Sequence, residues 1–142
     1  MKKNTKVTIA VALIGLVATA AVAFKYVNAR TKIKELEADK TLGYLGGEGW
    51  LGRNIIFVQY WESFDHLEKF ARSKDHSHLP AWQRFLKNVG INGDVGIWHE
   101  TYEVKKGSYE NIYANMPPFL LGKVGKLEKV GTSNNSARKR KG

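Results

Sequence analysis

The sequence predicts an α+β domain that follows an N-terminal membrane helix. Two observations lead to this fold class. Residues 7–24 form an uncharged apolar run between basic flanks, which has the length that a membrane helix needs. Downstream, residues 95–104 alternate as a strand does, whereas residues 63–74 carry apolar side chains at helical spacing. The 142 residues suit a single domain.

The positive charge lies mainly at the two ends of the chain, whose net charge is +10. Residues 43–130 carry 11 Lys or Arg and 10 Asp or Glu, whereas residues 131–142 carry 4 basic and no acidic residues. A DNA-binding domain carries its basic patch on the fold itself, so we expect no nucleic-acid partner. Basic ends beside an apolar run favour contact with membrane lipid. The absence of cysteine excludes disulfides and thiolate metal sites.

Three interpretations compete for the apolar run, and we favour a single-pass anchor over residues 7–24 after a basic N-terminus, 1–6. As a helix the run measures about 27 Å, enough to cross a thin bilayer. Lysines flank both ends, so the side of the membrane that holds the domain is undetermined. The alternatives are a signal peptide cleaved after Ala23 and a buried β-strand over Val7–Gly15, whose β-branched start allows it.

Residues 25–41 are predicted to form a helical connector, which we interpret as a solvated helix leaving the membrane. The domain proper is placed at residues 42–130. Residues 42–47 and 54–61 are predicted strands, and the glycine-rich residues 46–54 between them are predicted to form a hairpin loop.

Two helices and one strand follow. Ser63 is a good N-cap for the first helix, and Pro80 and Gly90 mark the start and end of the second. Residues 95–104 form the last predicted strand. The Ser-, Asn- and Lys-rich residues 131–142 are expected to be a disordered basic tail.

This order of elements is helix, strand, strand, helices, strand. One further strand at the front would complete βαββαβ, a ferredoxin-like unit. If the apolar run crosses the membrane, that first strand is missing, and a later segment or a partner chain must fill the gap at the edge of the sheet.

Three stretches carry a family resemblance: KELEAD (34–39), VQYWESFDHLEKFARSKDHSHLPAWQRF (58–85) and VGIWHETYEVKKGSYENIYANMPPFLLGKV (95–124). Together they resemble an uncharacterised monooxygenase-like family of the dimeric α+β barrel superfamily. The resemblance implies a ferredoxin-like fold whose sheets pair into a homodimer around a cavity. Its relatives include cofactor-free oxygenases and haem-binding proteins. The Ala- and Val-rich front departs from the family pattern.

The sharpest functional feature is Trp98-His99-Glu100-Thr101-Tyr102. Alternation along a strand sends Trp98, Glu100 and Tyr102 to one face and His99 to the other. His99 shares its face with aliphatic residues, so we expect it beneath the helices. Glu100 is then the candidate base and Tyr102 a donor in a ligand cavity.

The remaining candidates are weaker. The catalytic set is Glu100, His99 and His78, with Gln59, Trp61, Trp82, Trp98 and Tyr102 lining the ligand pocket. His78 and Trp82 lie one helical turn apart and would flank a pocket mouth. No metal is expected, because an HxH pair alone is a weak signal. No cofactor is predicted, and haem held by one histidine remains an alternative.

Two functions are therefore predicted. One is a membrane-anchored enzyme, monooxygenase-like or lyase-like, that acts on or binds a small apolar molecule. The other is a non-enzymatic membrane-tethered module that binds a ligand or a partner.

Overall fold

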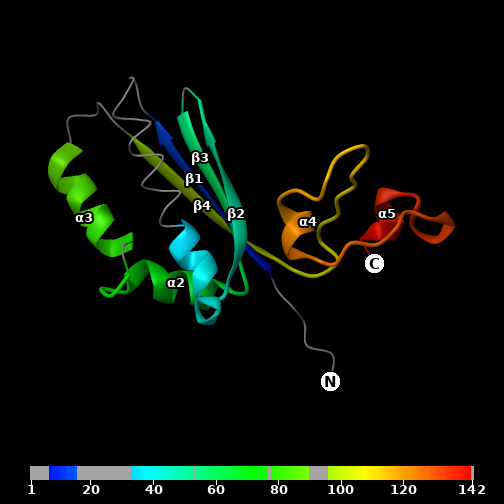
Figure 1. Ribbon diagram of the computed structural model, residues 1–142, viewed down its shortest axis with the longest axis horizontal. Coiled ribbons are helices and arrows are strands. Elements are labelled where there is room, and N and C mark those ends of the chain that lie inside the picture. The colour runs from blue at the N-terminus through cyan, green and yellow to red at the C-terminus, as the bar shows by residue number, and fades with distance from the viewer. Residues whose placement is uncertain (1–6, 16–32, 53, 77, 90–95, 142) are drawn as a thin grey trace.

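The computed structural model describes residues 7–15, 33–52, 54–76, 78–89 and 96–141. A four-stranded antiparallel sheet is covered by helices on one face, and the C-terminal part of the chain lies on the other (Figure 1). The strands are β1 (Val7–Gly15), β2 (Tyr44–Leu51), β3 (Asn54–Trp61) and β4 (Ile97–Val104), in the order β2-β3-β1-β4. The helices are α2 (Phe64–Arg72), α3 (His78–Val89), α4 (Leu121–Val124) and α5 (Ala137–Arg140), with 3₁₀ turns η1 (Lys40–Leu42) and η2 (Thr132–Asn134).

The first strand occupies residues for which a membrane anchor was predicted. Val7–Gly15 forms β1, paired antiparallel with β3 on one side and β4 on the other. These nine residues therefore follow the strand interpretation, and the membrane anchor over residues 7–24 stays a prediction that the described residues do not support. Residues 8–14 have a paired residue on both sides, and such pairing satisfies the backbone groups of a central strand. Residues 16–24 lie outside the described residues.

With β1 in place, the chain follows the βαββαβ order, because residues 33–38 are helical and lie between β1 and β2. The α+β class is confirmed, and the antiparallel sheet fits the ferredoxin-like fold. Within the described ranges, no helix has both the length and the apolar composition that crossing a membrane requires.

The glycine-rich stretch after Gly43 forms a strand where a loop was expected. β2 runs through to Leu51, and only residues 52 and 53 remain between it and β3. The glycines permit close approach of the neighbouring strand. A Cβ on Gly49 would lie 2.5 Å from the ring of Phe57, and one on Gly47 would lie 2.4 Å from the Val58 carbonyl oxygen. The glycines suggested a loop, but the close packing of the sheet requires residues without a side chain at these positions.

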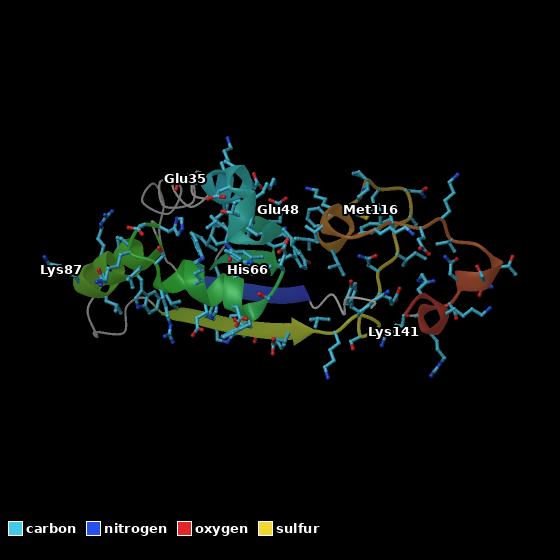
Figure 2. All side chains as sticks on the ribbon, turned by 90° about the horizontal axis from the view of Figure 1, so that it is seen from below. Glu35, Glu48, His66, Lys87, Met116 and Lys141 are labelled. Carbon is cyan, nitrogen blue, oxygen red and sulfur yellow. The ribbon has the colours of Figure 1, made fainter. Side chains whose placement is uncertain are left out.

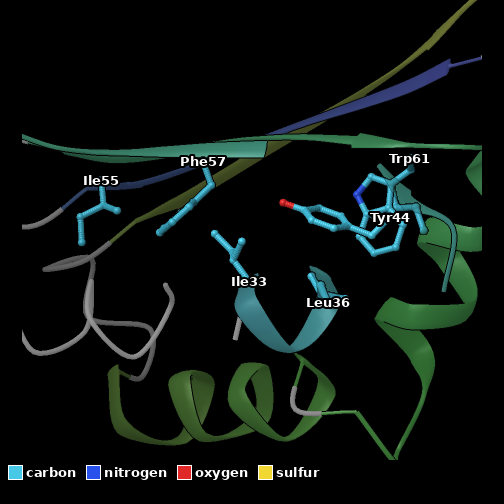
Figure 3. Packing of buried hydrophobic residues seen from close by; sticks show 7 residues of the cluster. Ile33, Leu36, Tyr44, Ile55, Phe57 and Trp61 are labelled. Carbon is cyan, nitrogen blue, oxygen red and sulfur yellow. The ribbon is translucent and has the colours of Figure 1, made fainter. Parts of the chain in front are cut away.

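The core lies between the sheet and the helices (Figure 3). Its buried members come from four elements: Ile33, Leu36, Tyr44, Ile55, Phe57, Trp61 and Leu67. Ile33 and Leu36 belong to the connector that we expected to be solvated, so that expectation is wrong. Their spacing of three places both on one side of the helix, against β3. Ser63 caps α2 as predicted, since its hydroxyl accepts a hydrogen bond from the His66 N–H at 3.3 Å.

The C-terminal tail also differs from expectation. The structure gives residues 131–141 two short helical turns, η2 and α5, where disorder was expected. The Arg140 guanidinium contacts the Glu110 carboxylate at 2.8 Å, and both side chains are mostly buried. Arg140 also donates to the Asn134 carbonyl oxygen. A partly buried ion pair with additional hydrogen bonds is the kind of contact that orders a charged segment.

Replacing Val11 with Pro tests the position of β1. Proline has no N–H and fits poorly in a central strand, so we expect Val11→Pro to remove cooperative unfolding of the domain, followed by circular dichroism in urea. A membrane helix would tolerate proline. Val130→Pro, at an exposed residue outside regular structure, is the control and should unfold like the unaltered chain. An unchanged transition for Val11→Pro would contradict the strand.

Candidate functional site

The sheet face opposite α2 and α3 is the candidate site, and we call it the open face. Strand register identifies its members, because residues paired across strands lie on the same face. Trp61 lies in the helix-side core and pairs with Tyr44 and Thr8, so these positions mark the helix side of their strands. Because side chains alternate along a strand, the register then gives the positions of the open face. These positions are Gly46, Glu48 and Trp50 on β2, Ile56, Val58 and Tyr60 on β3, and Trp98, Glu100 and Tyr102 on β4.

The register arranges these positions in rows that run across the sheet. Glu48 pairs with Val58, and Val58 pairs with Val11 of β1, which in turn pairs with Glu100. Glu48 and Glu100 therefore lie at the two ends of one row, and their backbones are about 14 Å apart, which is three strand spacings. Trp50 and Trp98 end the adjacent row in the same way. The open face thus has an apolar middle and polar or aromatic ends.

A C-terminal strap, residues 119–124, covers the β2 side of this face. The ring of Phe119 meets Trp50 edge-on with centroids 6.1 Å apart. The Lys123 ammonium lies 3.8 Å from the Glu48 carboxylate and 5.4 Å from the centroid of the Phe119 ring. In Figure 1 the strap, which includes α4, lies on the side of the sheet away from α3.

Tyr113 fixes the shape of the strap. Its hydroxyl donates to the Phe119 carbonyl oxygen and accepts from the Gly122 N–H at 2.9 Å. A Cβ on Gly122 would lie 2.6 Å from this hydroxyl, so only glycine fits there. The strap also covers Tyr60, whose pKa is raised by burial and by the nearby Tyr113, while a backbone hydrogen bond from Leu121 opposes the shift.

The β4 side of the open face remains accessible. Trp98 is 45% exposed and Tyr102 is 50% exposed, whereas Glu100 between them is half-buried. A hydrogen bond to Glu100 raises the pKa of Tyr102 above its ordinary value of 10.0, and desolvation and the carboxylate charge act in the same direction. The pair therefore presents a neutral tyrosine beside a carboxylate, which is a donor next to a proton acceptor.

The predicted site residues divide between the two faces. Trp98, Glu100 and Tyr102 lie together on the open face. His99 lies on the helix-side face, as alternation predicted, but its side chain is exposed. The expectation that His99 is buried is wrong, because the core lies over β2 and β3 and β4 is an edge strand.

The other predicted pocket residues belong to the helix side. Gln59 pairs with Gly47 and Ala10 on that face. Trp61 is fully buried between the rings of Tyr44 and Phe70, so it is a core residue where a pocket residue was predicted. Its indole N–H has no hydrogen-bond partner within the described part of the chain.

Trp82 is 41% exposed on α3, and the side chain of His78, at the start of α3, lies outside what the structure describes. The structure therefore does not gather the eight predicted residues into one site.

Sequence reasoning missed the β2 side of the open face. Glu48 and Trp50 lay in the expected loop, and Phe119 and Lys123 lay in a segment with no predicted contact. The signal that was present is the alternation Gly47-Glu48-Gly49-Trp50, in which every second residue carries a large side chain. Figure 2 labels Glu48 on the sheet and Met116 in the C-terminal part of the chain.

Metal and haem were tested against the donor atoms present. Among the described residues, no three histidine, aspartate or glutamate side chains form a cluster that could hold a metal. His66 and His76 belong to the helix side, where His66 lies close to Gly43 and the ring of His76 packs on Phe70. With His99 also on that side, no described histidine faces the accessible half of the open face, so haem ligated by histidine does not fit there.

Comparison with known proteins decides the family. A sequence model of the family described as Monooxygenase af470-like matches residues 9–121. The chain belongs to this family. The family is part of the dimeric α+β barrel superfamily, as the resemblance implied. The match begins inside β1 and ends at the first residue of α4, so β1 is part of the family domain.

One curated relative in the family is "Monooxygenase af470" of Aspergillus fumigatus, which is 34% identical over 88 residues. The alignment covers 58% of this chain and 30% of that protein. This chain therefore spans less than a third of the relative's length. No solved structure matches the chain. The family match includes β4, which carries Glu100 and Tyr102, whereas residues 122–142 lie beyond the match.

The Glu100–Tyr102 pair predicts a measurable titration. Because Glu100 raises the pKa of Tyr102, the folded state holds the phenol proton above pH 10.0, and this stabilising contribution is lost as pH rises through the folded-state pKa. Glu100→Gln should lower the midpoint of Tyr102 toward 10.0. Ultraviolet titration, with the spectrum of a Tyr102→Phe variant subtracted in each background, isolates this residue. Tyr60, raised by burial, should be unaffected. An unchanged Tyr102 midpoint would show that the two side chains do not interact.

Proposed function

We propose that the protein binds a small apolar molecule on the β4 side of the open face, and that Glu100 removes a proton from it, as in a monooxygenase-like enzyme. The observation that carries this proposal is the Glu100–Tyr102 pair beside an exposed Trp98. Glu100 and Tyr102 lie two residues apart on the same face of β4, and the carboxylate raises the pKa of the phenol. A neutral tyrosine therefore stands beside the proposed base.

The apolar surroundings support a ligand of matching character. Ile56 and Val58 are half-buried on β3, and Trp98 offers a large aromatic surface on β4, in the same row as Ile56 and two strands away from it. Sites for small molecules are mostly apolar with a few placed polar groups. The matching family name, Monooxygenase af470-like, supports an oxidative reaction. The part assigned to Glu100 is proton transfer from the ligand, with Tyr102 donating to the oxygen that becomes negative.

The two tryptophans on opposite faces provide a matched test of binding. N-phenyl-1-naphthylamine, a neutral apolar dye that fluoresces when bound, is the probe. Trp98→Ala should weaken its binding roughly tenfold, as loss of one aromatic contact implies. Trp82→Ala removes a tryptophan of similar exposure, 41% against 45%, from the helix side and should leave affinity unchanged. If only Trp82→Ala weakened dye binding, the ligand would bind on the helix side, and our proposal would be wrong.

Proton removal is tested with 2-tetralone, a small aromatic ketone with acidic C–H groups. The protein should accelerate exchange of these protons for deuterium, followed by nuclear magnetic resonance. Glu100→Gln should slow the catalysed exchange by about 100-fold or more, the usual effect of losing a general base, without changing dye binding. Binding of the dye without Glu100-dependent exchange would favour the alternative, a non-enzymatic binding module.

Self-association is the second part of the proposal. We propose that a second copy covers the accessible half of the open face and encloses the ligand. Trp98 and Tyr102 are large, exposed and on one face, and the superfamily is named for its paired sheets. Exposed contiguous apolar surface marks interaction sites.

Sedimentation velocity tests this pairing. The unaltered chain should sediment as a dimer, and Trp98→Lys should give monomers because a charge would be buried in the interface. Trp82→Lys, the matched change on α3, should remain dimeric. A monomer over the micromolar range for the unaltered chain would refute the pairing.

A further inference from the structure

The part of the chain after β4 forms a basic C-terminal unit, residues 105–141, which includes the strap and extends away from the sheet on the side opposite α3 (Figure 1). It contains 9 Lys or Arg and only 2 Asp or Glu, so its net charge is +7. In Figure 2, Met116 and Lys141 in this unit lie toward the end of the molecule opposite Lys87 of α3. Among the residues that the structure describes, the excess of positive charge therefore lies at one end of the protein.

The same unit exposes aliphatic side chains. Five large aliphatic residues are exposed among the described residues, and four of them belong to this unit: Ile112, Met116, Leu127 and Val130. Exposed apolar groups that cluster in one part of a protein mark an interaction surface. Neither the core nor the strap uses these four side chains as buried members.

Basic and aliphatic residues alternate most closely after the strap. Lys126 and Lys129 alternate with Leu127 and Val130 in a stretch without regular secondary structure. Lys126 contacts Glu128 at 3.2 Å, but both side chains are largely exposed, and such a pair adds little. The ammonium groups are therefore available to a partner, with aliphatic side chains beside them.

Internal contacts hold the unit in one shape. The Asn134 side chain donates to the Lys129 carbonyl oxygen at 3.1 Å and accepts from the Gly131 N–H. The Glu110–Arg140 pair joins the two ends of the unit across 30 residues. A folded unit loses less conformational entropy on binding than a disordered tail would.

We propose that the C-terminal unit docks the protein on the surface of a membrane that contains anionic lipid. Lysines near an anionic leaflet are attracted to it, and exposed aliphatic side chains gain by entering the headgroup boundary. Nucleic acid would match the charge but not the aliphatic groups. Binding to single strands uses exposed aromatic rings, whereas the unit's Tyr109, Tyr113 and Phe119 are half-buried. This surface is separate from the open face and does not depend on the function proposed there.

The test uses the full chain and flotation with two kinds of vesicle, phosphatidylcholine alone and phosphatidylcholine mixed with phosphatidylserine. The unaltered chain should bind the mixed vesicles more tightly, and added salt should weaken that preference. The double variant Lys126→Gln/Lys129→Gln should bind mixed vesicles about 30-fold more weakly, since each basic residue near such a surface contributes roughly 1 kcal/mol.

Matched variants elsewhere in the chain control for the change in overall charge. Every variant retains the apolar residues 7–24, so a difference between variants does not come from that segment. Lys69→Gln/Lys74→Gln removes two exposed lysines around α2 and should bind almost as well as the unaltered chain. Leu127→Ser should weaken binding several-fold, as loss of a half-exposed leucine implies. Leu86→Ser, at a leucine of similar exposure on α3 (50% against 46%), should not. Circular dichroism confirms that each variant is folded.

Three results would overturn the proposal. The first is equal binding by the Lys126→Gln/Lys129→Gln and Lys69→Gln/Lys74→Gln variants, which would reduce the effect to net charge. The second is an affinity for vesicles that changes neither with phosphatidylserine nor with the Leu127→Ser substitution. The third is tighter binding to a single-stranded RNA oligonucleotide than to mixed vesicles, with Leu127→Ser as effective as the unaltered chain, which would identify a nucleic-acid surface.

Discussion

The backbone hydrogen bonds of β1 hold the two parts of the sheet together. β4 is joined to the sheet only through β1, whereas β2 and β3 form a hairpin that pairs without it. Glu100 and Tyr102 lie on β4, so the candidate site keeps its geometry only while β1 occupies the centre. The apolar, β-branched residues of β1 suit this place, because a central strand has neighbours on both sides and no edge in water.

The two faces of the sheet therefore differ in what covers them. On the helix side, Trp61 is enclosed by Tyr44 and Phe70, and residues from the connector and α2 complete the core. On the open face, the C-terminal strap covers only the β2 side, through Phe119 on Trp50 and Lys123 on Glu48. The strap therefore narrows the accessible surface to the strip around Glu100. A site of this kind is built from a rigid strand and is bounded by a segment near the end of the family domain.

Most of the fold could be predicted from local patterns. Ser63 as an N-cap, the apolar spacing of α2 and the alternation of Trp98 to Tyr102 are local signals, and each leads to the element that the structure contains. The opposite faces of His99 and Glu100 also follow from the two-residue period of a strand. The family could be identified from short motifs, because these motifs include the core residues of β3 and the open-face residues of β4.

The amino-acid sequence by itself determined the α+β class, the family and the candidate pair Glu100 and Tyr102. Only the tertiary structure gave Val7–Gly15 a place in the sheet, since an apolar segment satisfies its backbone groups equally well as a helix in lipid or as a central strand. It also decided that His99 is exposed while Trp61 is buried. Both residues lie on the helix-side face of the sheet, but burial depends on which strand the helices cover. That choice is made by contacts between distant parts of the chain, such as Ile33 and Leu36 against β3, and no local pattern records them.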